Sequence, residues 1–443
     1  MEPVKSDGAK GSLRQASALF KVKTGALLAE ELAPQGWLHW QPKSLPASSR
    51  PRLRLRRTEL LDAEELLQLA RQKTGLTELG AWRFLPSFRR LVRGLNEEAE
   101  LNAAGRRRHH ERLLEILCTR LRFEAYCQRY PEILQEPLAA PVVIVGLPGT
   151  GSTLLQRLIA SDPRFYSAAW WETRFPVPFA AGDVGKRDDP RIEAARHEIA
   201  TMLEAEPMLR HSHPFDARAA DEDSCLLEQA FFSTNPEAAA HLPNYSRWLA
   251  GQDPTEGYRY LRALLQFLQW QKRQRGESAE RWVLKSPCHL HNLAVLLKVF
   301  PGAKIVQTHR DPEESLPALI HLIKNLWQMN SDRVQPRVLA RHWSLKMAAA
   351  LTDCIQLRKC GAETQFHDVR HEQIEQDPLQ VIIEIYASVG MPMTSEAWDL
   401  ILATLAHEGG VAPLPDRAAL PELGLTLAEI RQEFASYSGR FLA

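Results

Sequence analysis

The sequence predicts an α/β fold with a P-loop-type parallel sheet flanked by helices, preceded by a mostly helical N-terminal region. Short, continuous apolar runs alternate with segments of helical spacing after about residue 137. This alternation is typical of parallel strands that helices cover on both faces. The first apolar run also leads directly into a glycine-rich turn and a helix, as a βα unit does.

The N-terminal region covers residues 1–136 and includes a basic linker. We expect an amphipathic helix over 16–32. The arginine-rich run at 50–57 is interpreted as a solvated linker or arm, because charge runs are usually exposed. The other interpretation of that run is an electrostatic contact with an acidic partner or an anionic substrate.

Two further helices are expected before the sheet begins. One starts after an N-cap at Thr58 or Asp62, and the next covers 96–129. Side-chain caps and apolar stripes of this kind mark helix starts. A break at 131–141, which contains prolines at both ends, separates these helices from a second domain that we expect to cover 137–443.

The second domain is expected to contain four strands. The expected strands are 142–145, 281–284, 304–308 and 365–369, and the expected helices are 191–208, 224–233, 289–300 and 378–389, besides the helix after the glycine-rich turn. In open parallel sheets, ligands bind beyond the carboxyl ends of the strands. The residues directly after each strand are therefore candidate site residues.

The charge balance and the cysteines exclude several classes of protein. The 443 residues include 55 Lys and Arg and 54 Asp and Glu, a formal net charge of +1, which argues against nucleic acid as a partner. The six cysteines are scattered, a pattern that suits a reducing cytosol and argues against a structural zinc site. No apolar run approaches the roughly 18 residues that a membrane span requires. We therefore expect a cytoplasmic protein with no membrane span; its oligomeric state is not predicted.

The glycine-rich turn predicts an anion site. A turn of this kind points backbone N–H groups at the N-terminus of the next helix, where the helix dipole favours negative charge. Gly146 and Gly151 fit the pattern of nucleotide triphosphatases, but Ser152 and Thr153 stand where that pattern requires lysine and then serine or threonine. A serine cannot supply the missing cation. The remaining interpretation without a ligand is an ordinary βα turn.

Cations follow two neighbouring strands. Lys285 and Ser286 end the second expected strand, and His309, Arg310 and Asp311 follow the third. An anion-binding turn, a lysine and an arginine at one sheet edge suit a ligand with several separated anionic groups. No carboxylate pair of the Walker B type ends an apolar strand, so we expect no metal ion in the site.

Three segments carry a family resemblance: VVIVGLPGTGSTLLQRLIASDP at 142–163, WVLKSPCHLHNLAVLLKVFPGAKIVQTHRDPEESLPAL at 282–319, and Glu372–Gly390 with Asp377-Pro378. Together they resemble the sulfotransferases that use 3′-phosphoadenosine-5′-phosphosulfate (PAPS), and most closely the large, mainly bacterial branch of that family. The similarity extends from about Pro141 to the C-terminus. It implies a sulfotransferase-like α/β domain.

The resemblance also implies roles for individual residues. It implies that the turn binds the 5′-phosphosulfate of PAPS, or the 5′-phosphate of the product adenosine 3′,5′-bisphosphate, through Pro148, Gly149, Thr150, Gly151, Ser152 and Thr153. Arg310 would bind the 3′-phosphate, and Lys285 would lie near the bridging oxygen or the sulfuryl group. Glu172 is the first choice for the general base, with His213 and His289 as competing candidates.

Three positions depart from the family pattern. Gly149 stands where an arginine or lysine is usual, Ala318 replaces a serine that commonly shares the 3′-phosphate, and residues 413–417 lack the usual basic group. Ser315, one helical turn before Ala318, could supply the missing hydroxyl. Arg417 or Lys285 could restore the charge.

The sequence thus predicts a metal-independent sulfotransferase that moves a sulfuryl group from PAPS to a hydroxyl or amine of a small molecule. The Trp170-Trp171 pair favours an apolar or aromatic acceptor pocket. The alternative is a protein of the same fold whose donor site is altered or lost, and which acts in a different reaction or as a binding protein. A nucleotide triphosphatase or kinase is disfavoured by Ser152.

Overall fold

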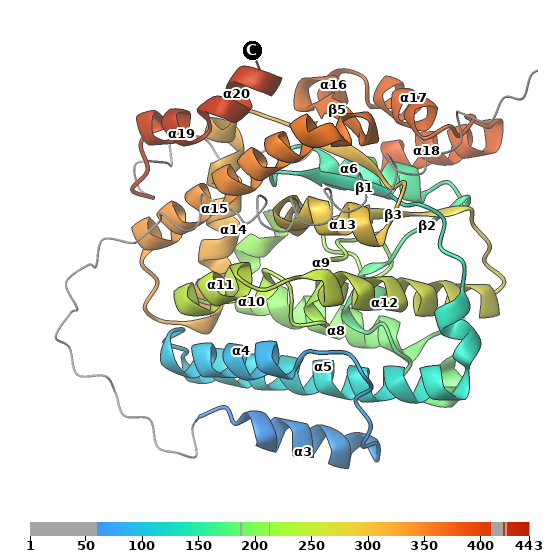
Figure 1. Cartoon of the computed structure of the whole chain (residues 1–443), viewed down its shortest axis with the longest axis vertical. Coiled ribbons are helices and arrows are strands. Elements are labelled where there is room, and N and C mark those ends of the chain that lie inside the picture. Colours follow the sequence, from blue (N-terminus) through green and yellow to red (C-terminus); the bar gives the residue numbers. More distant parts are fainter. Residues whose placement is uncertain (1–59, 187, 212, 409–419, 421–422, 443) are drawn as a thin grey trace, which may run out of the picture. The chain divides into compact units, whose positions relative to one another are not determined.

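A computed structural model shows the architecture of the chain (Figure 1). The structure describes residues 60–186, 188–211, 213–408, 420 and 423–442, and all of these belong to a compact unit that covers Leu55–Ala443. A parallel sheet surrounded by helices confirms the predicted α/β class. The expected helix at 16–32, the basic run at 50–57, Thr58 and Arg417 lie outside the described residues.

The sheet positions the site. Its strands are β1 (Val142–Gly146), β2 (Phe165–Tyr166), β3 (Arg281–Lys285), β4 (Lys304–His309) and β5 (Phe366–Arg370). Among the described residues they form one five-stranded sheet in the order β2-β3-β1-β4-β5, and every pairing is parallel. The register pairs Ile144 of β1 with Lys285 and Gly146 with Thr308. The ends of β3 and β4 therefore flank the end of β1.

Four of these strands lie where the sequence predicts them, within one or two residues. Strand β2 was not predicted, because two residues are too short to show any periodicity. β1 packs on both faces: Val143 and Val145 belong to one apolar cluster, and Val142 and Ile144 to another. This two-sided burial explains why the strand is a continuous apolar run rather than an alternating one.

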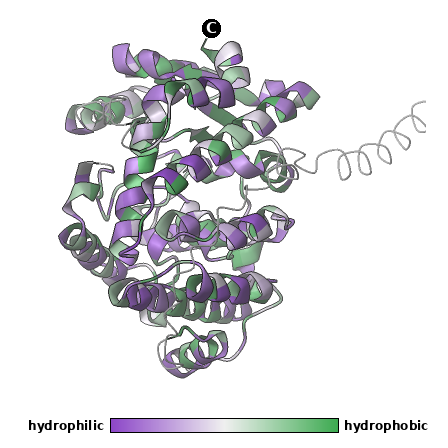
Figure 2. Ribbon diagram, turned by 90° about the vertical axis from the view of Figure 1, so that its left-hand side faces the viewer, coloured by the Kyte–Doolittle hydropathy of each residue, from purple (hydrophilic) through white to green (hydrophobic). Residues whose placement is uncertain are grey.

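The helices surround this sheet. In chain order the α-helices are α3 (Ala63–Thr74), α4 (Leu85–Glu97), α5 (Ala103–Arg129), α6 (Ser152–Ala160), α7 (Trp170–Arg174), α8 (Pro190–Ala205), α9 (Ser224–Glu228), α10 (Asn235–Ala239), α11 (Pro243–Ala250), α12 (Thr255–Gln274), α13 (Leu293–Val299), α14 (Pro312–Asn330), α15 (Pro336–Leu357), α16 (His371–Gln376), α17 (Pro378–Ser388), α18 (Ser395–Glu408), α19 (Leu427–Glu433) and α20 (Ala435–Phe441). Short helical turns are η2 (Pro131–Gln135), η3 (Ala181–Asp183), η4 (Pro207–His211), η5 (Pro287–Asn292), η6 (Arg358–Ala362) and η7 (Glu363–Gln365). In Figure 2 these helices carry both hydrophobic and hydrophilic residues, as amphipathic helices around a core do.

The helical region before the sheet contains three helices in its described part. Asp62 caps α3 by accepting from the backbone N–H groups of Glu64 and Glu65, which confirms that expected cap. The prediction of a single helix over 96–129 is wrong, because the helical conformation is interrupted between α4 and α5. Glu100 there has a φ of 46°, a left-handed conformation that interrupts a helix, and Asn102 caps α5. The domain boundary near residue 137 stays a prediction.

Two more predicted helices differ from the structure. The helix expected over 224–233 ends early, at Glu228, and Phe231 beyond it has a φ of 59°. The helix expected over 289–300 is divided into η5, which begins at a proline, and α13.

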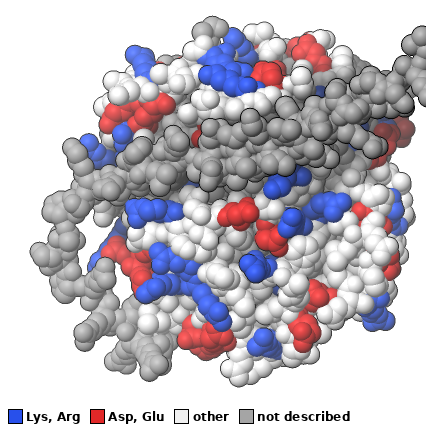
Figure 3. All heavy atoms as spheres, in the orientation of Figure 1, with Lys and Arg blue, Asp and Glu red and all other residues white. Residues whose placement is uncertain are grey.

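Among the described residues, no helix is long and apolar enough to cross a membrane. On the face seen in Figure 3, basic and acidic side chains are interspersed.

Candidate functional site

The glycine-rich turn between β1 and α6 has the backbone of an anion cradle. Gly149 and Gly151 have φ values of 80° and 85°, which only glycine adopts without strain. A Cβ at Gly146 would lie 2.1 Å from the Thr308 hydroxyl oxygen, so the turn and β4 approach too closely for any side chain. Gly151 is the N-cap of α6, and no side chain caps that helix. The free N–H groups of the first turn can therefore bind an anion.

Thr150 fixes this turn rather than presenting its hydroxyl to a ligand. Its Oγ1 donates to the Leu147 carbonyl at 2.8 Å and lies 2.6 Å from Thr308 Oγ1. The residue is fully buried. Any bond from Thr150 to a ligand must therefore come from its backbone, whereas the side chains of Ser152 and Thr153 are only partly buried.

Lys285 extends from the end of β3 to the first turn of α6. Its Nζ donates to Thr153 Oγ1 at 3.1 Å and to Glu222 Oε1 at 2.5 Å. Its backbone N–H donates to Asp223 Oδ1 at 3.0 Å. The side chain is 5% exposed. The structure therefore brings this predicted cation to the predicted turn.

Arg310 reaches the same turn from the other side. Its Nη1 donates to the Gly149 carbonyl at 2.9 Å, and its Nε donates to Glu314 Oε2 at 3.0 Å. The guanidinium thus lies at the position where the family usually carries a basic side chain. Positive charge at Gly149 comes from β4 instead of from the turn.

His309 connects Arg310 to the end of the chain. Its Nδ1 lies 3.1 Å from the Tyr437 hydroxyl, and its Nε2 lies 2.8 Å from Asp368 Oδ1. The imidazole also stacks on the Phe441 ring, with centroids 4.3 Å apart. Helix α20 therefore braces the residue that precedes Arg310.

The role of Ser315 in place of the hydroxyl missing at Ala318 stays a prediction that the geometry does not favour. Its Oγ donates to the Asp311 carbonyl at 3.2 Å, within α14, and the residue is fully buried. This is the common bond from a helical serine to the carbonyl four residues earlier. The structure therefore places Ser315 in the helix packing and not at the turn.

An acidic run, Asp221–Asp223, supplies site residues that the sequence did not identify. Each carboxylate binds a different partner: Asp221 binds His213, Glu222 binds Lys285, and Asp223 binds His289. The run was visible in the sequence next to His213-Pro214. No local pattern, however, connected it to Lys285, which lies 63 residues from Glu222.

His289 is enclosed by protein groups. Its Nε2 lies 2.7 Å from Asp223 Oδ2, and its Nδ1 lies 2.9 Å from the Tyr258 hydroxyl. The side chain is 0% exposed. Because both ring nitrogens have partners, we interpret His289 as an anchor of the Lys285-Ser286-Pro287 turn.

His213 has the geometry of an oriented base. Its Nε2 lies 2.7 Å from Asp221 Oδ2, and within the described part of the chain Nδ1 has no hydrogen-bond partner. Burial acts to raise the pKa of Asp221, but His213 and Lys285 outweigh it and the pKa lies below its usual value. The His213 ring contacts Phe215, with centroids 4.8 Å apart. A carboxylate on one ring nitrogen fixes the orientation and leaves the other available.

Glu172, the first choice for the base, lies in a buried ion-pair network. Its carboxylate accepts from Lys272 Nζ at 2.7 Å, Arg275 Nη2 at 2.8 Å and the Ala169 backbone N–H at 3.1 Å. The side chain is 1% exposed. Burial acts to raise its pKa, but the two cations outweigh burial and lower it. The base role stays a prediction that this geometry does not favour.

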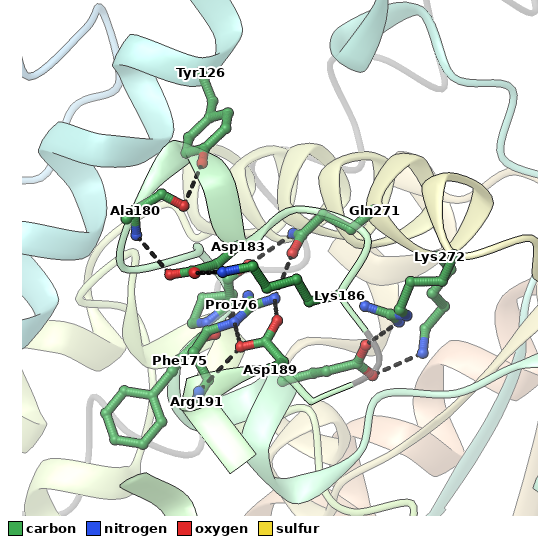
Figure 4. Close-up of polar contacts among 12 residues, drawn as sticks. Tyr126, Phe175, Pro176, Ala180, Asp183, Lys186, Asp189, Arg191, Gln271 and Lys272 are labelled. Atoms are coloured by element: carbon green, nitrogen blue, oxygen red, sulfur yellow. Dashed lines mark hydrogen bonds and ion pairs between the residues drawn. The ribbon is translucent and has the colours of Figure 1, made fainter. Parts of the chain in front are cut away.

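A second buried ion pair contacts the residue that precedes Lys272 in α12. In Figure 4, Gln271, the neighbour of Lys272 in α12, accepts a hydrogen bond from Arg191, which also binds Asp189. The Glu172–Lys272 pair joins α7 to α12, and Arg191 joins α8 to α12.

Replacing Glu172 with glutamine is expected to lower the free energy of unfolding by about 3 kcal/mol, because two buried cations lose their partner. The pKa of Glu172 is depressed in the folded state, so its contribution is present at neutral pH and is lost as pH falls through the folded-state pKa. Denaturant unfolding of both proteins between pH 7 and pH 3 measures the difference. An unchanged stability with a large loss of kcat would instead indicate a base.

His371 is a further site residue that the sequence analysis missed. It directly follows β5 and is 2% exposed, and its Nδ1 would lie 3.5 Å from a Cβ on Gly151. Burial lowers the pKa of His371, and the charge of Arg310 lowers it further. The rule that ligands bind at strand ends would have identified this position.

Comparison with known proteins defines the class of this protein. The family model described as "Sulfotransferase family" matches residues 141–395, more than half of the chain. The chain therefore belongs to the sulfotransferase family, which confirms the predicted membership.

Two curated proteins with similar sequences come from mycobacteria. The omega-hydroxy-beta-dihydromenaquinone-9 sulfotransferase Stf3 of Mycobacterium bovis is 26% identical over 259 residues, which are 57% of this chain and 63% of that protein. The same match is found for Stf3 of Mycobacterium tuberculosis. The chain thus spans less than two thirds of the length of these curated relatives.

Two solved structures resemble the whole fold. Sulfotransferase STF1 from M. tuberculosis has a TM-score of 0.73 and 25% identity, and the match covers 86% of this chain and all of that one. Sulfotransferase STF9 from Mycobacterium avium has a TM-score of 0.74 and 28% identity, covering 86% and 96% of the two chains.

Within the described ranges, no group of three or more His, Cys, Asp or Glu side chains is placed to hold a metal ion.

Proposed function

We propose that this protein transfers a sulfuryl group from PAPS to a hydroxyl group of a small, apolar acceptor. One observation carries the proposal: Lys285, at the end of β3, contacts Thr153 in the first turn of the uncapped helix α6, and Arg310, directly after β4, contacts Gly149 in the turn before that helix. A nucleotide with separated phosphate and sulfate groups matches this distribution of positive charge.

The residues around the turn fit the donor. The backbone N–H groups of the turn and the hydroxyls of Ser152 and Thr153 would bind its 5′-phosphosulfate. Arg310 would bind the 3′-phosphate as a planar, charged fork. Lys285 would neutralise charge that develops on the leaving oxygen, the main requirement in transfers of this type.

We further propose His213 as the general base. Among the three candidates, Glu172 holds two cations and both nitrogens of His289 are occupied. His213 would accept the proton of the acceptor hydroxyl as its oxygen attacks the sulfur. The bond between that sulfur and the bridging oxygen breaks, and adenosine 3′,5′-bisphosphate leaves.

An apolar alcohol is the acceptor class that we propose. Trp170 and Phe215 lie beside His213 and pack edge to face, with ring centroids 5.4 Å apart. Aromatic side chains in such a position favour an apolar or aromatic ligand. The name of the Stf3 relative, an omega-hydroxy-menaquinone sulfotransferase, supports a hydroxylated apolar acceptor.

Calorimetric titration with adenosine 3′,5′-bisphosphate tests the donor site. We expect saturable binding by the natural protein and about 10- to 100-fold weaker binding by Arg310→Ala, the cost of lost hydrogen bonds to a charged group. Arg259→Ala serves as the control, because Arg259 is 58% exposed and pairs with Glu256 on its own helix. Absence of binding at millimolar nucleotide would contradict the proposal.

The departures at Gly149 and Ala318 favour a second candidate, a protein that keeps the fold with an altered donor site. The two candidates differ in whether labelled sulfate moves from PAPS to an alcohol. Transfer that disappears in Arg310→Ala would reject the second candidate, and nucleotide binding without transfer to a broad set of alcohols would favour it.

A further inference from the structure

Lys285 has a counter-charge within the protein. Its Nζ donates to Glu222 Oε1 at 2.5 Å and to Thr153 Oγ1 at 3.1 Å. The lysine is 5% exposed, whereas the Glu222 side chain is 27% exposed. The carboxylate is thus the more exposed partner of the pair.

The backbone on both sides of Glu222 is fixed. The preceding Asp221 binds His213, and its Oδ1 accepts from the Glu222 backbone N–H at 2.6 Å. The following Asp223 binds His289 and accepts from the backbone N–H of Lys285. Movement at Glu222 is therefore restricted to its side chain, which pairs with one cation, Lys285, within the described ranges.

Glu222 differs from the structural carboxylates of this protein. Glu172 is 1% exposed and binds two cations, so it cannot leave its partners without stranding buried charge. Among the residues that the structure describes, Glu222 pairs with Lys285 alone, and its partly exposed side chain can turn toward water. Breaking the ion pair of Glu222 therefore costs much less free energy than breaking the ion pairs of Glu172.

We propose that Glu222 is a carboxylate latch, which competes with the bound nucleotide for Lys285. This inference rests on the proposed function, because the competing ligand is the anionic donor or its product. When the nucleotide binds, the ammonium of Lys285 transfers its hydrogen bond from Glu222 to the nucleotide. When the product leaves, Glu222 recaptures the ammonium, so the latch weakens nucleotide binding and speeds product release.

The latch predicts that a substitution improves affinity. Glu222→Gln keeps a side chain of the same size and removes the negative charge, so adenosine 3′,5′-bisphosphate no longer competes with a carboxylate. We expect its Kd, measured by calorimetry, to fall about tenfold, in the range of one hydrogen bond between charged groups. Inhibition of the transfer reaction by this product should strengthen in parallel.

Two further variants serve as controls for the role of Lys285. In the Lys285→Met background, Glu222→Gln should leave the Kd unchanged, because the cation for which they compete is gone. Glu256→Gln removes a carboxylate from the exposed Arg259 pair and should also leave it unchanged. Equal or weaker binding by Glu222→Gln than by the natural protein would overturn the latch, as would tighter binding that persists without Lys285. Failure of the natural protein and of Glu222→Gln to bind the nucleotide would instead overturn the proposed function and the latch together.

Discussion

Replacing Lys285 with alanine is expected to lower kcat by about 10²–10³-fold, the usual cost of removing one preorganised group that stabilises transition-state charge. The ammonium is held against Thr153 at the first turn of α6, where the proposed sulfuryl group binds. Single-turnover transfer of labelled sulfate measures the chemical step directly.

Controls separate this effect from misfolding. Lys298→Ala removes a lysine on the exposed face of α13 and should leave kcat unchanged. Thermal unfolding should show that the Lys285→Ala protein is folded. A folded Lys285→Ala protein with normal single-turnover transfer would show that the lysine takes no part in the reaction.

Replacing His213 with alanine is expected to lower kcat by about 10²–10⁴-fold, the usual contribution of a general base. The effect on the Kd of adenosine 3′,5′-bisphosphate should be small, because His213 faces the acceptor in the proposed arrangement. Asp221→Asn should give a smaller loss of kcat, since the imidazole remains but loses the carboxylate that orients it.

His197→Ala is the matched control, because His197 lies on the exposed face of α8. Full activity of His213→Ala together with inactivity of a folded Glu172→Gln protein would reverse the assignment of the base. Comparable losses in both would indicate that the acceptor pocket itself depends on the two side chains.

The sheet and the turn could be predicted because their signals are local. Val142–Val145 of β1 are all apolar since both faces of the strand are buried, Gly146 ends the strand, and Gly149 and Gly151 follow in the turn. The strand-end rule then identified Lys285 and Arg310, although they lie far apart in the sequence. The structure places both at the turn.

The remaining site residues depend on contacts that no local pattern encodes. A basic residue stands only two positions after Glu172 in the sequence. The cations that form ion pairs with the Glu172 carboxylate are instead Lys272 and Arg275, from the end of α12. Asp223 joins Lys285 and His289 across more than 60 residues. Ser315 has the right spacing, but its hydroxyl bonds within its own helix. Position along the chain predicted which residues come near the site, and side-chain pairing decided what they do there.

The bracing of His309 by α20 has a consequence for synthesis of the protein. His309 and its partner Tyr437 are separated by 128 residues. At usual translation rates this gap corresponds to a delay of roughly 6–25 s. The sheet edge that carries Arg310 therefore leaves the ribosome well before the aromatic residues of α20 that contact His309.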